Sequence, residues 1–333
     1  MSSPHGTVHA CGHDCEKGDN FTTPSELITF GPVHLDISNL ERSIMFWRDL
    51  VGLHVLEATA GTAALGVDDA PLVVLHASAT RPVQRGYSGL YHFAINLPSE
   101  PDLARVLARV RASGRRYGAS DHMVAKSIYL HDPDGIGLEI TFETPDRVQS
   151  FRWDKGTESP LVIDAEGRKR SGVEPLDVEE VLAVLPDGDV MQPVPSGTIV
   201  GHLQFQVGNL ETSYQFYRDK IGLIQSIYAP WARYGDLGAG GRVGHRIALN
   251  MWHGIGAPPR ASGVAGLRSF TMRFASQERL RDAVARIGTA ELHGRDYAVH
   301  DPDGNALFMV FGLPTSDVDN STRTEIFGKD WSS

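Results

Sequence analysis

The chain has 333 residues, of which 41% are hydrophobic and 22% charged, as in ordinary water-soluble globular proteins. Its 41 acidic residues outnumber its 31 lysines and arginines, so its surface is predicted to repel phosphate, which argues against nucleic acid and anionic membranes as partners. We find no apolar run that could cross a bilayer, no secretory signal, and cysteines only at Cys11 and Cys15, a pattern that predicts a cytoplasmic protein without a disulfide framework.

The order of predicted elements is the same in successive parts of the chain. Alternating and β-branched residues predict strands, apolar residues three and four apart predict helices, and Asp-Pro-Asp-Gly predicts a turn. Along the first half this gives, in order, strand 33–37, helix 40–50, short strands ending near 73–75, strand 91–96, helix 101–113, and strands near 128–130 and 138–140. The repeated unit is therefore βαβββ.

The second half of the chain repeats the first. Residues 31–41 align with 201–211, residues 89–93 with 266–270, and His-Asp-Pro-Asp-Gly occurs at both 131–135 and 300–304. We therefore expect four βαβββ modules in an α+β fold. The predicted organisation is a flexible tail (1–25), a first domain of modules one and two (26–145), a linker (146–198), a second domain of modules three and four (199–313), and a C-terminal tail (314–333). Within the linker, 176–185 is predicted to contain a short helix starting near Asp177.

Four such modules, with Gly-Leu-Tyr-His-Phe at 89–93, Asp-Pro-Asp-Gly at 132–135 and Gly-His at 201–202, resemble the vicinal oxygen chelate superfamily. The catechol 2,3-dioxygenase branch is the most similar, and the resemblance covers both halves. It implies that pairs of modules curl into cups of strands around a divalent metal ion. The metal ligands would come from the first strand of one module and from the first and last strands of its partner.

Carried onto this sequence, the resemblance places the metal ligands at His92 and Glu139 in module two and at His202 in module three. Two histidines and one carboxylate hold Fe(II) on one face, and Mn(II) is a possible substitute. The matching positions of modules one and four carry residues that ligate Fe(II) poorly, namely Pro32, Ser269 and Phe308. A complete site therefore requires modules two and three to face each other and modules one and four to pair, within one chain or across a dimer.

The same resemblance implies three catalytic residues. His245 would act as the acid–base group, Tyr129 would hydrogen-bond a substrate oxygen, and His122 would line the pocket. The implied function is extradiol cleavage of a catechol-type ring with O2, in the breakdown of aromatic compounds. A small aromatic diol and O2 are the expected partners, and a homo-oligomer is expected.

Other interpretations of these residues remain open. A histidine beginning a strand is often a surface or core residue, Glu139 could be solvated at an edge, and Tyr129 could simply favour the strand. His34 is interpreted as lining the second cup, and the His/Cys tail at 9–15 matches no zinc pattern. Alternative functions are a glyoxalase-type isomerase or lyase, an Mn(II) hydroquinone dioxygenase, and a metal-free binding protein. The isomerase needs a fourth ligand near Ala248, where no carboxylate occurs.

Overall fold

The computed structural model describes residues 26–154, 156, 159–185 and 190–312. The predicted tails, with their His/Cys cluster, lie outside the described residues. Within the described part, no helix is both long and apolar enough to cross a membrane.

The four predicted modules are visible as four runs of strands and helices. Module one comprises β1 (Ile28–Asp36), α1 (Leu40–Met45), η1 (Phe46–Val51), β2 (His54–Ala58), β3 (Thr62–Val67) and β4 (Ala70–His76). Module two comprises β5 (Gly89–Asn96), α2 (Glu100–Ala112), β6 (Gly118–Asp121), β7 (Ala125–His131) and β8 (Gly137–Glu143). Module three comprises β13 (Ile199–Gln206), α4 (Leu210–Gln215), η3 (Phe216–Ile221), β14 (Ile224–Ala229), η4 (Pro230–Ala232), β15 (Tyr234–Gly238) and β16 (Ile247–Asn250). Module four comprises β17 (Gly266–Phe274), α5 (Gln277–Ile287), β18 (Glu291–His293), β19 (Asp296–His300) and β20 (Ala306–Phe311).

Each large sheet takes one module from each half of the chain. Modules four and one form an eight-stranded sheet, in the order β18-β19-β20-β17-β1-β4-β3-β2. Modules two and three form the core of a nine-stranded sheet, in the order β12-β6-β7-β8-β5-β13-β16-β15-β14. The predicted crossed pairing is therefore confirmed, and it occurs within a single chain. Antiparallel pairing of β1 with β17 and of β5 with β13 joins the modules of each sheet.

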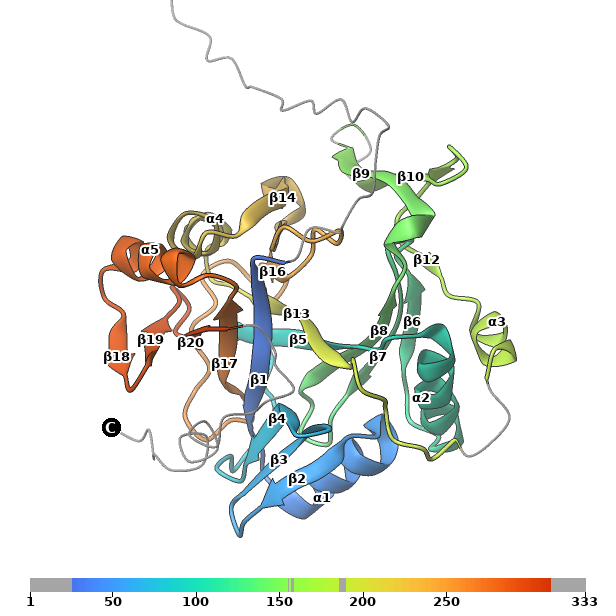
Figure 1. The fold of residues 1–333 in the computed structure, drawn as a ribbon, viewed down its shortest axis with the longest axis horizontal. Coiled ribbons are helices and arrows are strands. Elements are labelled where there is room, and N and C mark those ends of the chain that lie inside the picture. Colours follow the sequence, from blue (N-terminus) through green and yellow to red (C-terminus); the bar gives the residue numbers. More distant parts are fainter. Residues whose placement is uncertain (1–25, 155, 157–158, 186–189, 313–333) are drawn as a thin grey trace, which may run out of the picture.

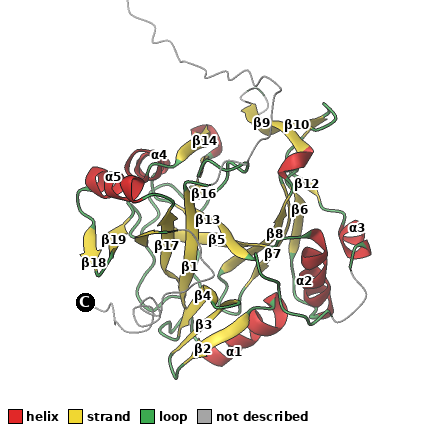
Figure 2. Ribbon diagram, viewed as in Figure 1, coloured by secondary structure: helices red, strands yellow, loops and turns green. Residues whose placement is uncertain are grey.

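The two sheets share one hydrophobic core. β1 and β13, from opposite halves of the chain, meet near the centre of the molecule (Figure 1). The rings of Phe205 on β13 and Phe270 on β17 lie 5.4 Å apart, and Trp47 of module one stacks on Phe93 of module two at 5.7 Å. Figure 2 shows the strands gathered at the centre, with the helices outside them. The concave faces of the sheets are thereby left free to carry polar residues.

One predicted helix differs from the prediction in its second half. The helix predicted over 40–50 is an α-helix only as far as Met45 and then widens into a π-helical turn, η1, and module three repeats this at η3. Both turns end at a glycine of positive φ, Gly52 at 94° and Gly222 at 95°. Residues with a side chain rarely adopt this conformation, which explains why glycine occupies both positions. Spacing of three and four cannot distinguish a single π turn from α-helix.

The linker contains more regular structure than predicted. Strands β9 (Val148–Asp154), β10 (Ser159–Asp164) and β11 (Lys169–Arg170) form a separate small sheet. The following β12 (Glu174–Pro175) extends the nine-stranded sheet by pairing with β6. The short helix is present as α3 (Val178–Ala183), where the Asp177 side chain accepts hydrogen bonds from two backbone N–H groups of the first turn.

Candidate metal centre

Three adjacent strands place His92, Glu139 and His202 on the concave face of the nine-stranded sheet. In the register of the sheet, Ala94 on β5 lies between His202 on β13 and Glu139 on β8. Because the side chain of Ala94 is a methyl group, the two longer side chains can converge above it. His92 lies two residues earlier on β5, and therefore on the same face. The alternate residues of these strands, such as Phe93 and Leu203, belong to the core.

A glycine bulge immediately precedes His202. The pairing of β13 with β5 shifts by one residue between Val200 and His202, leaving Gly201 without a partner. A Cβ atom at Gly201 would lie 2.0 Å from Oδ1 of Asn96, so no other residue fits there without displacing that side chain. The Gly-His pair noted in the sequence thus has a structural cause, because the glycine sets the register that brings His202 beside Glu139.

The three side chains present their ligand atoms to one point. Nε2 of His92 and Nε2 of His202 are 3.3 Å apart, and they lie 3.1 Å and 3.0 Å from Oε2 of Glu139. All three residues are buried. Burial lowers the pKa of His202 to about 4, so its ring is neutral near pH 7. Burial alone would raise the pKa of Glu139, but the two imidazoles outweigh it and hold that pKa well below its usual range.

This donor set fits a divalent cation. Ligand atoms about 2.1 Å from one ion and at right angles to each other lie about 3.0 Å apart, close to the three spacings observed. A neutral imidazole, as at His202, and an ionised carboxylate, as at Glu139, are also the forms that ligate metals. In the described part of the chain, this is the one group of three such residues whose ligand atoms converge.

His245 lies beside this group and is held by Asp236. The rings of His245 and His202 are 4.5 Å apart, and Nδ1 of His245 lies 3.0 Å from Oδ2 of Asp236. Oδ1 of Asp236 accepts the Ile227 N–H at 2.8 Å, and Oδ2 also accepts the Tyr234 hydroxyl at 3.1 Å. A carboxylate only accepts hydrogen bonds, so Nδ1 of His245 carries a proton. In the neutral ring, Nε2 is then the nitrogen without a proton. Burial lowers the pKa of His245, but the hydrogen bond and the charge of Asp236 raise it by more. The pKa of His245 is therefore above its usual value.

Tyr129 and His122 lie on the opposite side of the carboxylate. The Tyr129 hydroxyl donates to Oε1 of Glu139 at 3.1 Å and lies 2.7 Å from Nε2 of His122. Burial, reinforced by the nearby Glu139, raises the pKa of Tyr129 well above its usual value, so the phenol stays protonated. Burial lowers the pKa of His122. The structure therefore brings all six predicted site residues together.

The sequence interpretation missed Asp236. The available signal was an aspartate in a strand whose neighbours Gly235 and Leu237 are small or apolar, and such an aspartate needs buried donors. The aromatic residue Tyr234 contacts the Asp236–His245 pair and stacks on Trp252 at 6.1 Å.

The second cup has a different interior. His34 and His76 stack there, with Nδ1 of His34 lying 3.0 Å from Nε2 of His76. Burial lowers the pKa of His34 to about 3 and that of His76 to about 4, so both rings are neutral near pH 7. No carboxylate completes a converging trio with them among the described residues.

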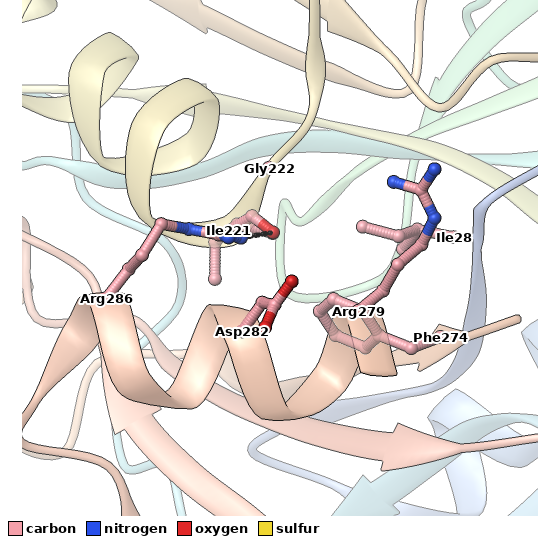
Figure 3. A pocket seen from close by; sticks show the side chains of 7 residues that line it. All are labelled: Ile28, Ile221, Gly222, Phe274, Arg279, Asp282 and Arg286. Atoms are coloured by element: carbon pink, nitrogen blue, oxygen red, sulfur yellow. Dashed lines mark hydrogen bonds between the residues drawn. The ribbon is translucent and has the colours of Figure 1, made fainter. Parts of the chain in front are cut away.

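A small surface pocket lies apart from both cups. It is located between η3 and α5 and is lined by residues including Ile221, Arg279, Asp282 and Arg286 (Figure 3). Arg286 there donates to the carbonyl groups of Lys220 and Ile221, which ties α5 to η3. We therefore regard this pocket as a packing feature.

The fold and the converging trio define a class of protein in which paired βαβββ modules hold a metal site. Residues 29–140 match the family model of the Glyoxalase/Bleomycin resistance protein/Dioxygenase superfamily. A catechol-2,3-dioxygenase of Bacillus subtilis (strain 168) is 32% identical over 284 residues, which cover 83% of this chain and 94% of the relative. The chain belongs to this superfamily, the vicinal oxygen chelate superfamily.

One solved structure shares the architecture at low sequence identity. A protein from Bacillus subtilis subsp. subtilis str. 168 superposes with a TM-score of 0.56 at 12% identity, covering 86% of this chain and 87% of the other. Glyoxalase I from Zea mays gives a TM-score of 0.49 at 15% identity, covering 85% and 92%. The Bacillus subtilis structure shows the fold, and the activity is inferred from the site residues.

Proposed function

We propose that the protein is an Fe(II)-dependent extradiol dioxygenase that opens a catechol-type ring. The observation that carries the proposal is the buried His92–Glu139–His202 trio with His245 beside it. The 32% identity to a catechol-2,3-dioxygenase over most of both chains supports the same reaction class. Two histidines and one carboxylate occupy one face of a metal ion and leave its other positions for ligands.

When bound, the metal supplies a Lewis-acidic centre that can hold both oxygens of a vicinal diol and O2. His92, His202 and Glu139 would hold it. Nδ1 of His245 faces Asp236, and Nε2, for which the described residues provide no hydrogen-bond partner, can take a proton from a diol hydroxyl and later return it. The protonated Tyr129 hydroxyl can donate a hydrogen bond to a substrate oxygen, and His122 lies behind it.

A glyoxalase-type reaction is the alternative within the same fold. It would need a further carboxylate near Ala248, and the residue paired with Ala248 across β15 and β16 is Asp236. The Asp236 carboxylate is already engaged by the Ile227 N–H, Tyr234 and His245. A carboxylate with these three partners is poorly placed to ligate a metal, and this favours the dioxygenase.

The test is anaerobic purification, metal analysis, Fe(II) loading, and addition of catechol with O2. We expect a yellow ring-opened product and O2 uptake. His202→Ala should lose metal and activity together, and His245→Ala should keep metal but turn over slowly. His34→Ala, in the second cup, is the matched control and should resemble the parent. Turnover of a haemithioacetal with Ni(II) or Zn(II), without diol cleavage, would instead establish the isomerase. Full activity of His202→Ala and His245→Ala would refute the site assignment.

Further predictions concern the metal and the assembly. Reconstitution with Mn(II) in place of Fe(II) should show which ion supports ring opening, with hydroquinone included as a second substrate. The homo-oligomer stays a prediction, to be measured by sedimentation. Because both modules of the site come from one chain, activity should persist in any monomer that forms at high dilution.

A further inference from the structure

Beyond the metal trio, the concave face of the site carries three buried amide side chains. Gln204 and Gln206 follow His202 at alternate positions of β13, so they share its face. Gln204 pairs with His92 across to β5, and Gln206 pairs with Asn250 across to β16. Their exposed fractions are 5% for Gln204, 2% for Gln206 and 0% for Asn250. The amides therefore form a row that starts at the metal ligands.

The orientation of two of these amides is determined by the backbone. Oε1 of Gln206 accepts the His253 N–H at 3.1 Å, and Oδ1 of Asn250 accepts the Trp252 N–H at 3.3 Å. Because a backbone N–H only donates, the oxygen of each amide must face it, and the NH2 group must face away. These NH2 groups, and that of Gln204, are buried without a hydrogen-bond partner among the described residues. Buried donors in this state are rare and energetically costly.

Aromatic side chains surround the outer end of the row. Tyr234 pairs with Asn250 across β15 and β16 and stacks on Trp252 at 6.1 Å. Tyr91 packs edge-on against Trp252 at 5.7 Å. Trp252 is 51% exposed and Tyr91 39% exposed, so they lie nearer the surface than the buried amides. The outer end of the amide row is thus bordered by aromatic rings, which suit a flat apolar molecule.

We propose that Gln204, Gln206 and Asn250 determine specificity by donating hydrogen bonds to an uncharged acceptor substituent on the aromatic diol, such as a carbonyl or ether oxygen. This inference rests on the proposed function and deepens it. The donors are neutral, and the nearby Arg246 is already ion-paired with Glu143 and Glu26. A carboxylate substituent would lose its hydration there without gaining a cation, so it is disfavoured. An alkyl substituent would leave the donors unpaired.

The test compares ring-substituted catechols carrying acetyl, isopropyl or carboxylate groups, which have equal numbers of heavy atoms. For each we would measure kcat/KM for ring cleavage and, separately, the anaerobic Kd for the Fe(II)-loaded protein. The parent should bind the acetyl compound more tightly than the isopropyl compound and the carboxylate most weakly. Gln204→Met and Gln206→Met should each reduce the acetyl-to-isopropyl ratio about tenfold, or about 1.4 kcal/mol. Comparing ratios between proteins cancels the electronic effect of each substituent.

The control is Gln215→Met, on the exposed surface of α4, which should leave the ratio unchanged. Gln204→Met removes no side-chain hydrogen bond among the described residues, so it remains informative if Gln206→Met unfolds. Equal affinity of the parent for acetyl and isopropyl compounds, or preference for the carboxylate, would overturn the proposal. If the parent cleaves no diol, the dioxygenase assignment fails. The anaerobic Kd ratios still test whether the amide row recognises the acceptor substituent.

Discussion

Replacing Asp236 by asparagine tests how the site prepares His245 for proton transfer. The substitution keeps the size of the side chain and removes the charge that faces Nδ1 of His245 across 3.0 Å. The Asp236 side chain is buried and that of His245 is 28% exposed, and a hydrogen bond to a charged group contributes about 1.5–3 kcal/mol. We therefore expect kcat to fall roughly 10- to 100-fold. The KM for the diol should change little, since Asp236 faces His245 and not the open ligand positions.

The pH dependence of activity gives a second prediction, which has a definite direction. Burial lowers the pKa of His245, while Asp236 raises it, and the net value in the parent is above the ordinary one. Neutral His245 is the form that takes a proton, so parent activity should rise with pH through this raised pKa. In Asp236→Asn burial dominates, and the rise should move to lower pH. The same pKa makes protonated His245 contribute stability at low pH, which is lost as pH rises through the folded-state value.

The assay is the pH profile of kcat and kcat/KM for catechol under air, with bound metal measured in the same samples. Tyr234→Phe is the matched comparison, because it removes one hydroxyl from the same carboxylate and keeps its charge. It should cost less activity and move the pH profile less. Loss of metal in Asp236→Asn would mean that Asp236 supports the trio instead. An unchanged kcat and profile would refute the coupling between Asp236 and His245.

Three more outcomes are expected. Glu139→Gln should weaken metal affinity by about 100-fold or more in a chelator competition, because the one anionic ligand is lost. Asp132→Asn should raise the melting temperature at pH 8. Burial raises the pKa of Asp132 to about 7, so the parent loses stability as pH rises from about 4 to 7, by up to roughly 4 kcal/mol; equal pH dependence in both proteins would contradict this. The equivalent Asp301→Asn should instead lower stability by about 1–3 kcal/mol in denaturant titrations, since Asp301 accepts the Tyr217 hydroxyl at 2.8 Å.

Much of the architecture could be predicted from sequence because the chain repeats itself. Alternation along the strands identifies which residues share a face, and the aligned segments with the repeated His-Asp-Pro-Asp-Gly turn locate the modules. The uneven distribution of ligand-type residues also indicated the crossed pairing, since modules two and three hold His92, Glu139 and His202 between them. The sheet order confirms this pairing and adds that one chain suffices.

The particular contacts that Asp236 and the amide row make across neighbouring strands could not be predicted from the sequence. Asp236 lies nine residues before His245, and the two meet only because β15 pairs with β16 in one register. The row of Gln204, Gln206 and Asn250 likewise depends on β13 lying parallel to β16. Single-residue bulges, such as that at Gly201, shift these registers, and a single sequence does not mark which glycine carries a bulge.

The sequence by itself therefore determined the kinds of side chain on each face and the modules able to share a metal. The tertiary structure alone decided which of those side chains touch. The physical reason is that strand periodicity is local, whereas register and sheet order arise from packing Phe205, Phe270 and their neighbours into one core.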